Sequence, residues 1–217
     1  MTDKNLTEIV AIIDRSGSMS CLVNETIGGF NNFLTEQQKL EGKAILTLVQ
    51  FDDQYQIDYN GVDINDVKPL DTTTYVPRGM TALLDAVGKT INTVGERLAN
   101  TEEDKRPGKV VFLIITDGQE NSSQEFLAEK VEEMVHHQTD KYQWSFVFLG
   151  GGDPDFQSAQ ATSLGIAPQN AYNYSANRVG TKAVYTNLSR GMSRMRLTND
   201  ADANESFLTD EEQEELK

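Results

Sequence analysis

Residues 8–18 read Glu8-Ile9-Val10-Ala11-Ile12-Ile13-Asp14-Arg15-Ser16-Gly17-Ser18. The apolar first half is typical of a strand that is buried on both faces, as in a parallel sheet. The second half places oxygen side chains at Asp14, Ser16 and Ser18, where that strand would end. A loop that turns back over the strand end can aim these side chains at one point. Such a point suits a hard cation, because hard cations in proteins take oxygen ligands.

A second apolar run ends in the same way. The segment Val110 to Thr116 is followed by Asp117-Gly118, so another carboxylate stands at the end of a strand-like segment. The carboxyl ends of parallel strands meet at one edge of an open sheet, where such sheets bind ligands. We therefore expect Asp14 and Asp117 to lie close together at that edge. Thr81, at the start of a predicted helix, is a natural further contributor.

Strand-like and helical patterns alternate along the rest of the chain. Apolar residues fall at helical spacing over about residues 20–40 and again from Thr81 to Leu98. Further strands are predicted at 43–51, 144–149 and 171–174, and the alternating segment 55–59 is typical of an exposed edge strand. This alternation predicts an α/β fold of parallel β-α-β units, with helices on both faces of the sheet.

Composition and net charge indicate which partners and which cell compartment to expect. The chain has 217 residues, enough for one well-buried core, and 34 acidic against 19 basic residues, which gives a net charge of −15. This charge disfavours binding to nucleic acid phosphates or to an anionic membrane. No apolar run is long enough to span a bilayer and the start lacks a secretion-signal pattern, so we expect a soluble, cytoplasmic protein. The single cysteine, Cys21, excludes an intrachain disulfide.

Acidic residues are concentrated at the C-terminal end. Residues 198–217 contain eight Asp or Glu and one basic residue, Lys217. So polar a segment cannot bury enough apolar surface to offset its ordering entropy, which predicts a domain over 1–197 and a disordered acidic tail over 198–217. Phe207-Leu208 is its only evident anchor. An alternative hypothesis is that the tail folds back onto the basic residues of the last predicted helix, which are Arg178, Lys182, Arg190, Arg194 and Arg196.

The oxygen cluster also has a simpler interpretation. Ser16, Ser18 and Thr81 could each be N-caps or turn residues, and Asp14 could also cap a helix. For any one of these residues taken alone, capping is the commoner role. The joint placement of Asp14, Ser16, Ser18 and Asp117 at strand ends favours a cation site over capping.

The same residues carry a resemblance to a known family. Asp14-x-Ser16-x-Ser18, then Gly79-Met80-Thr81, then Asp117-Gly118 resemble the metal-ion-dependent adhesion site (MIDAS) of the von Willebrand factor A (vWA) domain family, in the family's order. The likeness of layout extends from about Glu8 to Arg196 and leaves the acidic end outside it.

This resemblance implies a fold and a ligand set. It implies a doubly wound, mostly parallel, Rossmann-like sheet with an antiparallel edge strand and helices on both faces. It also implies Mg²⁺ or Mn²⁺ at the carboxyl edge, with an acidic side chain of a protein partner completing the coordination. On that pattern Asp14, Ser16, Ser18 and Thr81 would be direct or near-direct ligands, and Asp117 would bind directly or through water.

The leading functional hypothesis is a metal-dependent protein-binding module that is not an enzyme, because no catalytic set accompanies the cluster. The loop from Thr72 to Met80, with Tyr75 and Arg78, is expected to rim the metal site together with Arg15 and Met19. Exposed aromatic, Met and Arg side chains suit the recognition of a partner. The resemblance adds that intracellular microbial members often act beside AAA-type ATPases or in stress-response and defence assemblies, as a subunit or adaptor.

The enzymatic alternative is a Mg²⁺-dependent phosphohydrolase in which Asp14 attacks phosphorus, since that chemistry also uses an Asp at a strand end. Haloacid-dehalogenase-like enzymes, the nearest family for this interpretation, carry a second Asp two positions after the nucleophile. In this chain that position is Ser16. The sequence therefore favours the binding module.

Overall fold

The structure, a computed structural model, describes residues 1–198 and 206–216. A six-stranded sheet has the strand order β3-β2-β1-β4-β5-β6. Only the edge pair β2–β3 is antiparallel among these strand pairs. The strands are β1 (Asp3–Asp14), β2 (Lys43–Phe51), β3 (Tyr55–Asp63), β4 (Pro107–Thr116), β5 (Ser145–Gly151) and β6 (Ala171–Tyr174). The predicted mostly parallel sheet with an antiparallel edge strand is confirmed.

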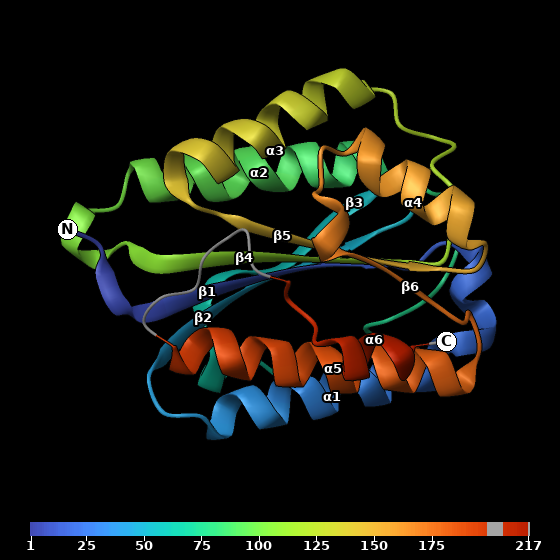
Figure 1. Ribbon diagram of the computed structural model, residues 1–217, viewed down its shortest axis with the longest axis horizontal. Coiled ribbons are helices and arrows are strands. Elements are labelled where there is room, and N and C mark those ends of the chain that lie inside the picture. Colours follow the sequence, from blue (N-terminus) through green and yellow to red (C-terminus); the bar gives the residue numbers. More distant parts are fainter. Residues whose placement is uncertain (199–205, 217) are drawn as a thin grey trace.

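Helices cover both faces of the sheet (Figure 1). One face is covered by α1 (Val23–Lys39), α5 (Arg178–Leu197) and the short α6 (Asp210–Glu214), and the other by α2 (Leu83–Ala99), α3 (Ala128–Tyr142) and α4 (Pro154–Ser163). Alternate residues of β1 enter the two cores: Ile9, Ala11 and Ile13 join the core under α1 and α5, whereas Val10 and Ile12 join the core under α2 and α3. Burial on both faces explains the continuous apolar run of β1.

The strand order reverses between β1 and β4. From β1 the chain moves outward to β2 and β3, and it then returns to place β4 on the other side of β1. The carboxyl ends of these two adjacent parallel strands therefore form a topological switch point, which is where open α/β sheets leave a crevice for ligands. In Figure 1 this edge lies on the right, next to the start of α1.

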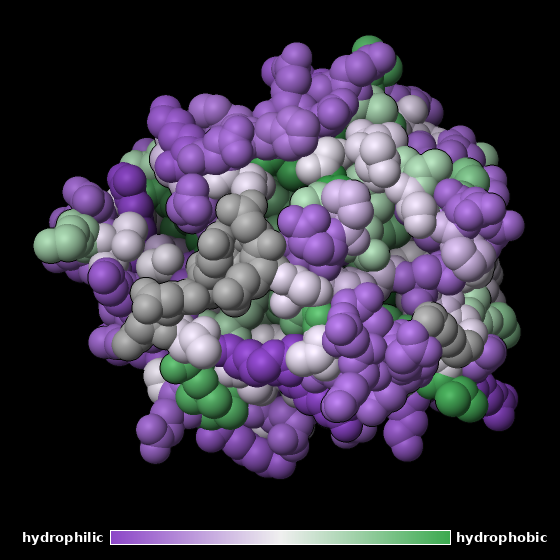
Figure 2. Space-filling view, viewed as in Figure 1, coloured by the Kyte–Doolittle hydropathy of each residue, from purple (hydrophilic) through white to green (hydrophobic). Residues whose placement is uncertain are grey.

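The surface in this view is largely hydrophilic over α3 and over α5 and α6 (Figure 2). Within residues 1–198 and 206–216, every helix is too short or too polar to cross a membrane. Both observations fit a chain in which the apolar residues are gathered into the two cores that flank the sheet.

The prediction of a disordered tail is wrong for residues 206–216, which pack on α5 and β6. Phe207, Leu208 and Leu216 are buried in the core beneath α1 and α5. Arg194 forms an ion pair with Glu212, as the fold-back hypothesis expected of the basic helix. Composition suggested a solvated segment because acidic residues outnumber the apolar ones, yet the few apolar residues are placed to enter the core. Residues 199–205 and 217, which the tail prediction also covers, lie outside the described residues.

Gly28 and Gly29 are neighbours in α1 but differ in their surroundings. A Cβ at Gly29 would lie 2.3 Å from a ring carbon of Tyr185 on α5, whereas a Cβ at Gly28 would meet no atom of the described residues within 4 Å. We expect Gly28→Ala to raise the free energy of unfolding by about 0.5–1 kcal/mol, because Ala favours a helix. Gly29→Ala should lower it by about 1–3 kcal/mol through overpacking. Urea unfolding of both variants tests this, and equal effects would contradict the close contact of α1 with α5.

Candidate metal site

Four of the predicted ligand residues form a connected chain of polar contacts. Asp14, the last residue of β1, is fully buried. Its Oδ1 accepts a hydrogen bond from the Ser16 backbone N–H at 2.6 Å, and its Oδ2 accepts one from the Thr116 hydroxyl at 2.6 Å. The Ser16 and Ser18 hydroxyl oxygens are 3.0 Å apart. The Ser18 hydroxyl donates to Asp117 Oδ1 at 2.5 Å. The carboxyl ends of β1 and β4 are thus joined through side-chain oxygens.

Thr81 reaches the same point from the segment just before α2. A Cβ at Gly118 would lie 2.6 Å from Thr81 Oγ1 and 3.1 Å from Asp14 Oδ2, so both oxygens face the bare Cα of Gly118. The Thr81 backbone is held by Asn121, whose side-chain oxygen accepts from the Thr81 N–H at 2.9 Å and whose own N–H donates to the Thr81 carbonyl at 3.0 Å. The structure therefore brings all five predicted ligand residues together, and any side chain at position 118 would displace the Thr81 hydroxyl.

Burial shapes the electrostatics of the two carboxyl groups. Burial raises the pKa of Asp14 to about 6. Hydrogen bonds from Thr116 and Ser16 act in the opposite direction and lower this pKa, whereas the charge of Asp117 raises it by a smaller amount. Burial also raises the pKa of Asp117, although the hydrogen bond from Ser18 opposes it. Two neighbouring carboxylates are thus held where their ionised forms are disfavoured. A cation between them would favour the ionised forms.

The donor set fits a hard divalent cation. It consists of oxygen atoms alone, from two carboxylates and three hydroxyls, and Mg²⁺ characteristically combines one or two carboxylates with water and other oxygens. In the described part of the chain, no group of three or more His, Cys, Asp or Glu side chains could hold a metal ion. At this edge the hydroxyls of Ser16, Ser18 and Thr81 would add to the two carboxylates as oxygen donors.

The expected rim of exposed side chains is wrong for most of its members. Met19 and Tyr75 are 0% and 1% exposed, and Arg15 is also buried. Tyr75 packs in the core beneath α1 and α5, and its hydroxyl donates to the Asp14 backbone carbonyl at 2.7 Å. Tyr75 therefore holds the end of β1 in place from within the core. The side chain of Arg78 is 50% exposed, as expected of a rim residue.

Two apolar side chains of the same loop are exposed instead. Val76 and Met80 stand on either side of Arg78 in the sequence and are about half exposed. The loop that carries them is tied to the Asp14–Ser18 loop, because the Gly17 N–H donates to the Gly79 carbonyl at 3.2 Å and the Arg78 N–H donates to the Arg15 carbonyl at 2.8 Å. Val76, Arg78 and Met80 are therefore the described loop side chains best placed to touch a partner.

Asp52 is a structural residue of the site that sequence reasoning missed. It is fully buried, and its Oδ2 pairs with Arg15 Nε at 3.2 Å and with Arg78 Nε at 2.7 Å. Its backbone carbonyl accepts from the Ala82 N–H at 2.8 Å. Asp52 thus ties together the two loops that carry Ser16 and Thr81. The local sequence Asp52-Asp53-Gln54 gave no signal of this role, since it is typical of an exposed turn.

Replacing Asp52 should disturb the candidate metal site without removing any of its proposed ligands. Asp52→Asn removes the counterion of Arg15, whose side chain is 5% exposed, so we expect the free energy of unfolding to fall by about 2–3 kcal/mol. Mg²⁺ affinity should fall about 10-fold, as is typical when a partner behind the ligands is lost. Asp53→Asn, at the exposed neighbouring position, is the matched control and should change neither quantity. Calorimetric Mg²⁺ titration and urea unfolding test both variants, and equal results would contradict the role of Asp52.

Comparison with known proteins supports the fold at low sequence identity. No protein-family model and no curated protein matches the chain. Proximal thread matrix protein 1 (PTMP1) from the mussel byssus matches at 15% identity and a TM-score of 0.59, over 88% of this chain and 47% of that chain. The ArnB paralog VWA2 from Sulfolobus acidocaldarius matches at 16% identity and a TM-score of 0.52, over 86% of this chain and 45% of that chain. A von Willebrand factor type A protein from Catenulispora acidiphila matches at 12% identity and a TM-score of 0.53, over 89% of this chain and 42% of that chain.

These structural neighbours are vWA domains, and the fold of this protein is of the same type. At such low identity the likeness establishes the fold alone. This chain spans less than half the length of each of these proteins. A further PTMP1 structure, at 13% identity and a TM-score of 0.56, is described as having a zinc-occupied MIDAS motif.

Proposed function

We propose that this protein is a cytoplasmic protein-binding module that depends on Mg²⁺ or Mn²⁺. The ligands, direct or through water, are Asp14, Ser16, Ser18, Thr81 and Asp117, and an acidic side chain of a protein partner completes the coordination. The observation that carries the proposal is the convergence of these side chains at the junction of β1 and β4. The zinc-occupied MIDAS of a protein with the same type of fold supports divalent metal binding here.

The distribution of charge and exposure supports an open coordination position. The hydroxyl ligands are neutral, so the two carboxylates would leave a divalent cation attractive to an outside carboxylate. Asp14 and Ser16 are buried, whereas Ser18 is exposed and Asp117 is half-buried. A partner would therefore approach from the side of Ser18 and Asp117. The loop that carries Val76, Arg78 and Met80 is hydrogen-bonded to the loop that carries Ser18.

The geometry does not favour Asp14 as a nucleophile. The residue is fully buried, and each of its carboxylate oxygens already accepts a hydrogen bond. A carboxylate that attacks phosphorus must reach the substrate. We therefore propose a binding function without catalysis, and the phosphohydrolase alternative gains no support from the site.

The wider role is proposed from the family resemblance. A module of this kind acts as a subunit or adaptor of a larger assembly, and an AAA-type ATPase or a stress-response or defence assembly is the kind of partner we propose. Recognition by an acidic side chain fits a protein partner better than nucleic acid or an anionic membrane, given the net charge of −15.

Thr81→Ala tests the proposal because the hydroxyl is a proposed ligand and its loss should leave the fold intact. In affinity capture from native lysate, the wild type in Mg²⁺ should retain a partner that neither Thr81→Ala nor the wild type in EDTA retains. Mass spectrometry would identify this partner. Thr35→Ala, which removes an exposed hydroxyl on α1, is the matched control. Equal retention of every protein by the wild type in Mg²⁺, by the wild type in EDTA and by Thr81→Ala would contradict the metal-dependent function.

A further inference from the structure

The C-terminal segment, defined as residues 206–216, is bound by the domain much as a peptide is bound by its receptor. It crosses α5 and β6, and in Figure 1 α6 lies against α5. The residues that hold it belong to the domain and come from β6, α5 and the turn before β6. We call them the segment groove: Asn170, Tyr172, Asn187, Gly191 and Arg194.

Two apolar anchors enter the groove. Phe207 packs against Gly191, where a Cβ would lie 2.4 Å from the phenyl ring. Leu208 is buried beside it in the core beneath α1 and α5. Gly191 is the residue that makes room for an aromatic ring on the surface of α5, so the groove is shaped for its occupant.

Side chains of the groove recognise the backbone of the segment. The Phe207 N–H donates to the side-chain oxygen of Asn170 at 3.1 Å, and the Leu208 N–H donates to the Tyr172 hydroxyl at 3.0 Å. The Asn187 side-chain amide donates to the Glu212 carbonyl at 2.7 Å. Backbone contacts of this kind, combined with pockets for chosen side chains, are a general way of binding peptides.

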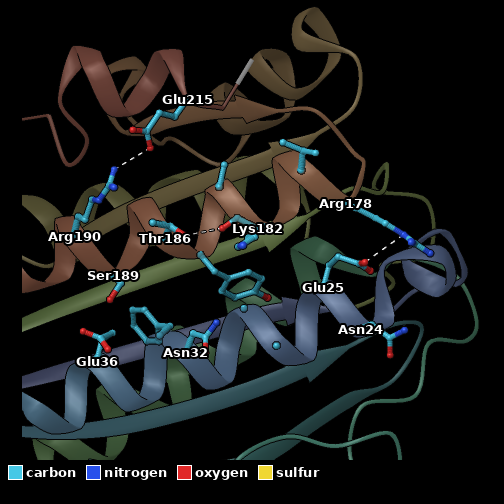
Figure 3. A pocket seen from close by; sticks show the side chains of 16 residues that line it. Asn24, Glu25, Asn32, Glu36, Arg178, Lys182, Thr186, Ser189, Arg190 and Glu215 are labelled. Carbon is cyan, nitrogen blue, oxygen red and sulfur yellow. Dashed lines mark hydrogen bonds and ion pairs between the residues drawn. The ribbon is translucent and has the colours of Figure 1, made fainter.

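Arginine side chains select for acidic residues. The guanidinium of Arg194 donates to both carboxylate oxygens of Glu212, at 2.7 and 2.6 Å, and to the Phe207 carbonyl at 2.9 Å. Arg190 pairs with Glu215 at 2.9 Å. Figure 3 shows Glu215 pointing toward Arg190 at one end of a hollow of about 960 Å³ between α1 and α5. Bidentate pairing with an arginine fork adds geometric selectivity as well as energy.

The segment depends on the groove for its shape. The helix α6 comprises five residues, and its N-terminus is closed by a capping box between Thr209 and Glu212. A helix this short is not stable alone in water. The surface over α6 is largely hydrophilic (Figure 2), whereas the anchors Phe207 and Leu208 are buried.

We propose that the segment groove is a peptide-binding site that the chain's own C-terminal segment occupies. Its second occupant is an acidic peptide of a partner protein with the same pattern: an apolar residue, Leu, Thr and a Glu three positions after the Thr. Arg194 of the groove and the neighbouring Arg190 supply the charge complementarity for such a peptide. This site is separate from the proposed metal site and does not depend on it.

Competition with a labelled peptide tests the proposal on the full-length chain. The probe is a fluorescent peptide of residues 206–216, measured by anisotropy. In the wild type the attached segment competes at an effective concentration on the order of millimolar. The variant Phe207→Ala/Leu208→Ala vacates the groove, so it should bind the peptide at least about ten-fold more tightly than the wild type. Adding Arg194→Ala should abolish this binding, whereas Arg178→Ala, on the same helix but paired with Glu25, should not.

A second variant that displaces the segment keeps the test valid if Phe207→Ala/Leu208→Ala does not fold. Glu212→Arg keeps both apolar anchors but places a second positive charge next to Arg194, which should repel the attached segment from the groove. This variant should also bind the peptide more tightly than the wild type does. Circular dichroism establishes that each variant is folded. The proposal is overturned if neither folded variant binds the peptide, or if Arg194→Ala leaves binding unchanged. The wild type could instead form a concentration-dependent dimer that Arg194→Ala dissociates. In that case the groove would bind a second copy of this chain, and the proposal of a partner peptide would be overturned.

Discussion

Asp117→Asn is expected to weaken Mg²⁺ binding on the order of 100-fold, because it removes one of the two negative charges of the donor set. The substitution keeps the shape of the side chain and leaves an oxygen that can accept from Ser18. Burial raises the pKa of Asp117, so ionisation of this residue is unfavourable in the folded protein without metal. Neutral Asn removes that penalty, and the metal-free variant should be at least as stable as the wild type.

Two measurements separate binding from folding. Calorimetric titration gives the Mg²⁺ affinity, and thermal unfolding with and without Mg²⁺ gives the stability. At a Mg²⁺ concentration of about 100 Kd, the wild type should gain about 2.7 kcal/mol of stability, and the variant at the same concentration should gain less than about 0.5 kcal/mol.

Asp153→Asn is the matched control for this prediction. Asp153 caps α4 at the same edge of the sheet and accepts from the backbone of Asp155 and Phe156, a role that Asn fills equally well. The control should therefore bind Mg²⁺ as the wild type does. If Asp117→Asn retained the affinity of the control, Asp117 would not be a ligand and the proposed donor set would have to be abandoned.

The main features of the fold and of the donor set could be predicted because they are encoded locally. The apolar runs of β1 and β4 are continuous since both faces of these strands are buried, and each run ends directly before a carboxylate. Once both strands are placed in a parallel sheet, the positions of Asp14 and Asp117 follow from where the runs end. Thr81 was a further candidate from its place at the start of a predicted helix, and the family resemblance supported it as a ligand.

Contacts between segments distant in the sequence could not be predicted. Asp52 stands in what is locally a polar turn, and only the packing of two loops around it makes it the buried partner of Arg15 and Arg78. Tyr75 is in a loop of polar residues, yet that loop folds over the sheet edge and inserts the ring into the core. The C-terminal segment was misjudged for the same reason. Its net charge is a property of the segment, whereas its docking depends on Arg194 and Gly191 of α5.

Arg97→Met is expected to cause the largest loss of stability, about 3–5 kcal/mol at pH 7. Glu8 on β1 is fully buried, and its Oε1 accepts from the Thr47 hydroxyl at 2.8 Å and is paired with Arg97 of α2. Burial raises the pKa of Glu8, while the charge of Arg97 and the hydrogen bonds from Thr47 and Arg97 oppose that rise. Met keeps the apolar stem of Arg97 but leaves the buried carboxylate without its counterion.

The pH dependence of this loss identifies its cause. Without Arg97 the pKa of Glu8 rises further above its unfolded value of 4.5, so ionisation begins to oppose folding above pH 4.5 and opposes it fully above the folded pKa. As the pH falls toward 5, Glu8 is protonated in the folded state and increasingly in the unfolded state as well, so the deficit of Arg97→Met relative to the wild type should shrink. Urea unfolding at pH 5 and pH 7 measures this change.

The double variant Glu8→Gln/Arg97→Met completes the test, because a neutral amide at position 8 has no charge to leave unpaired. It should recover most of the stability lost in Arg97→Met, and its deficit should be the same at pH 5 and pH 7. Arg97 also contacts Asn60 and covers Gly61. If the deficit of Arg97→Met were equal at both pH values and the double variant recovered nothing, these packing contacts would account for the loss. Recovery with loss of the pH dependence would instead identify Glu8 as a buried charge that folding tolerates only because α2 supplies its counterion.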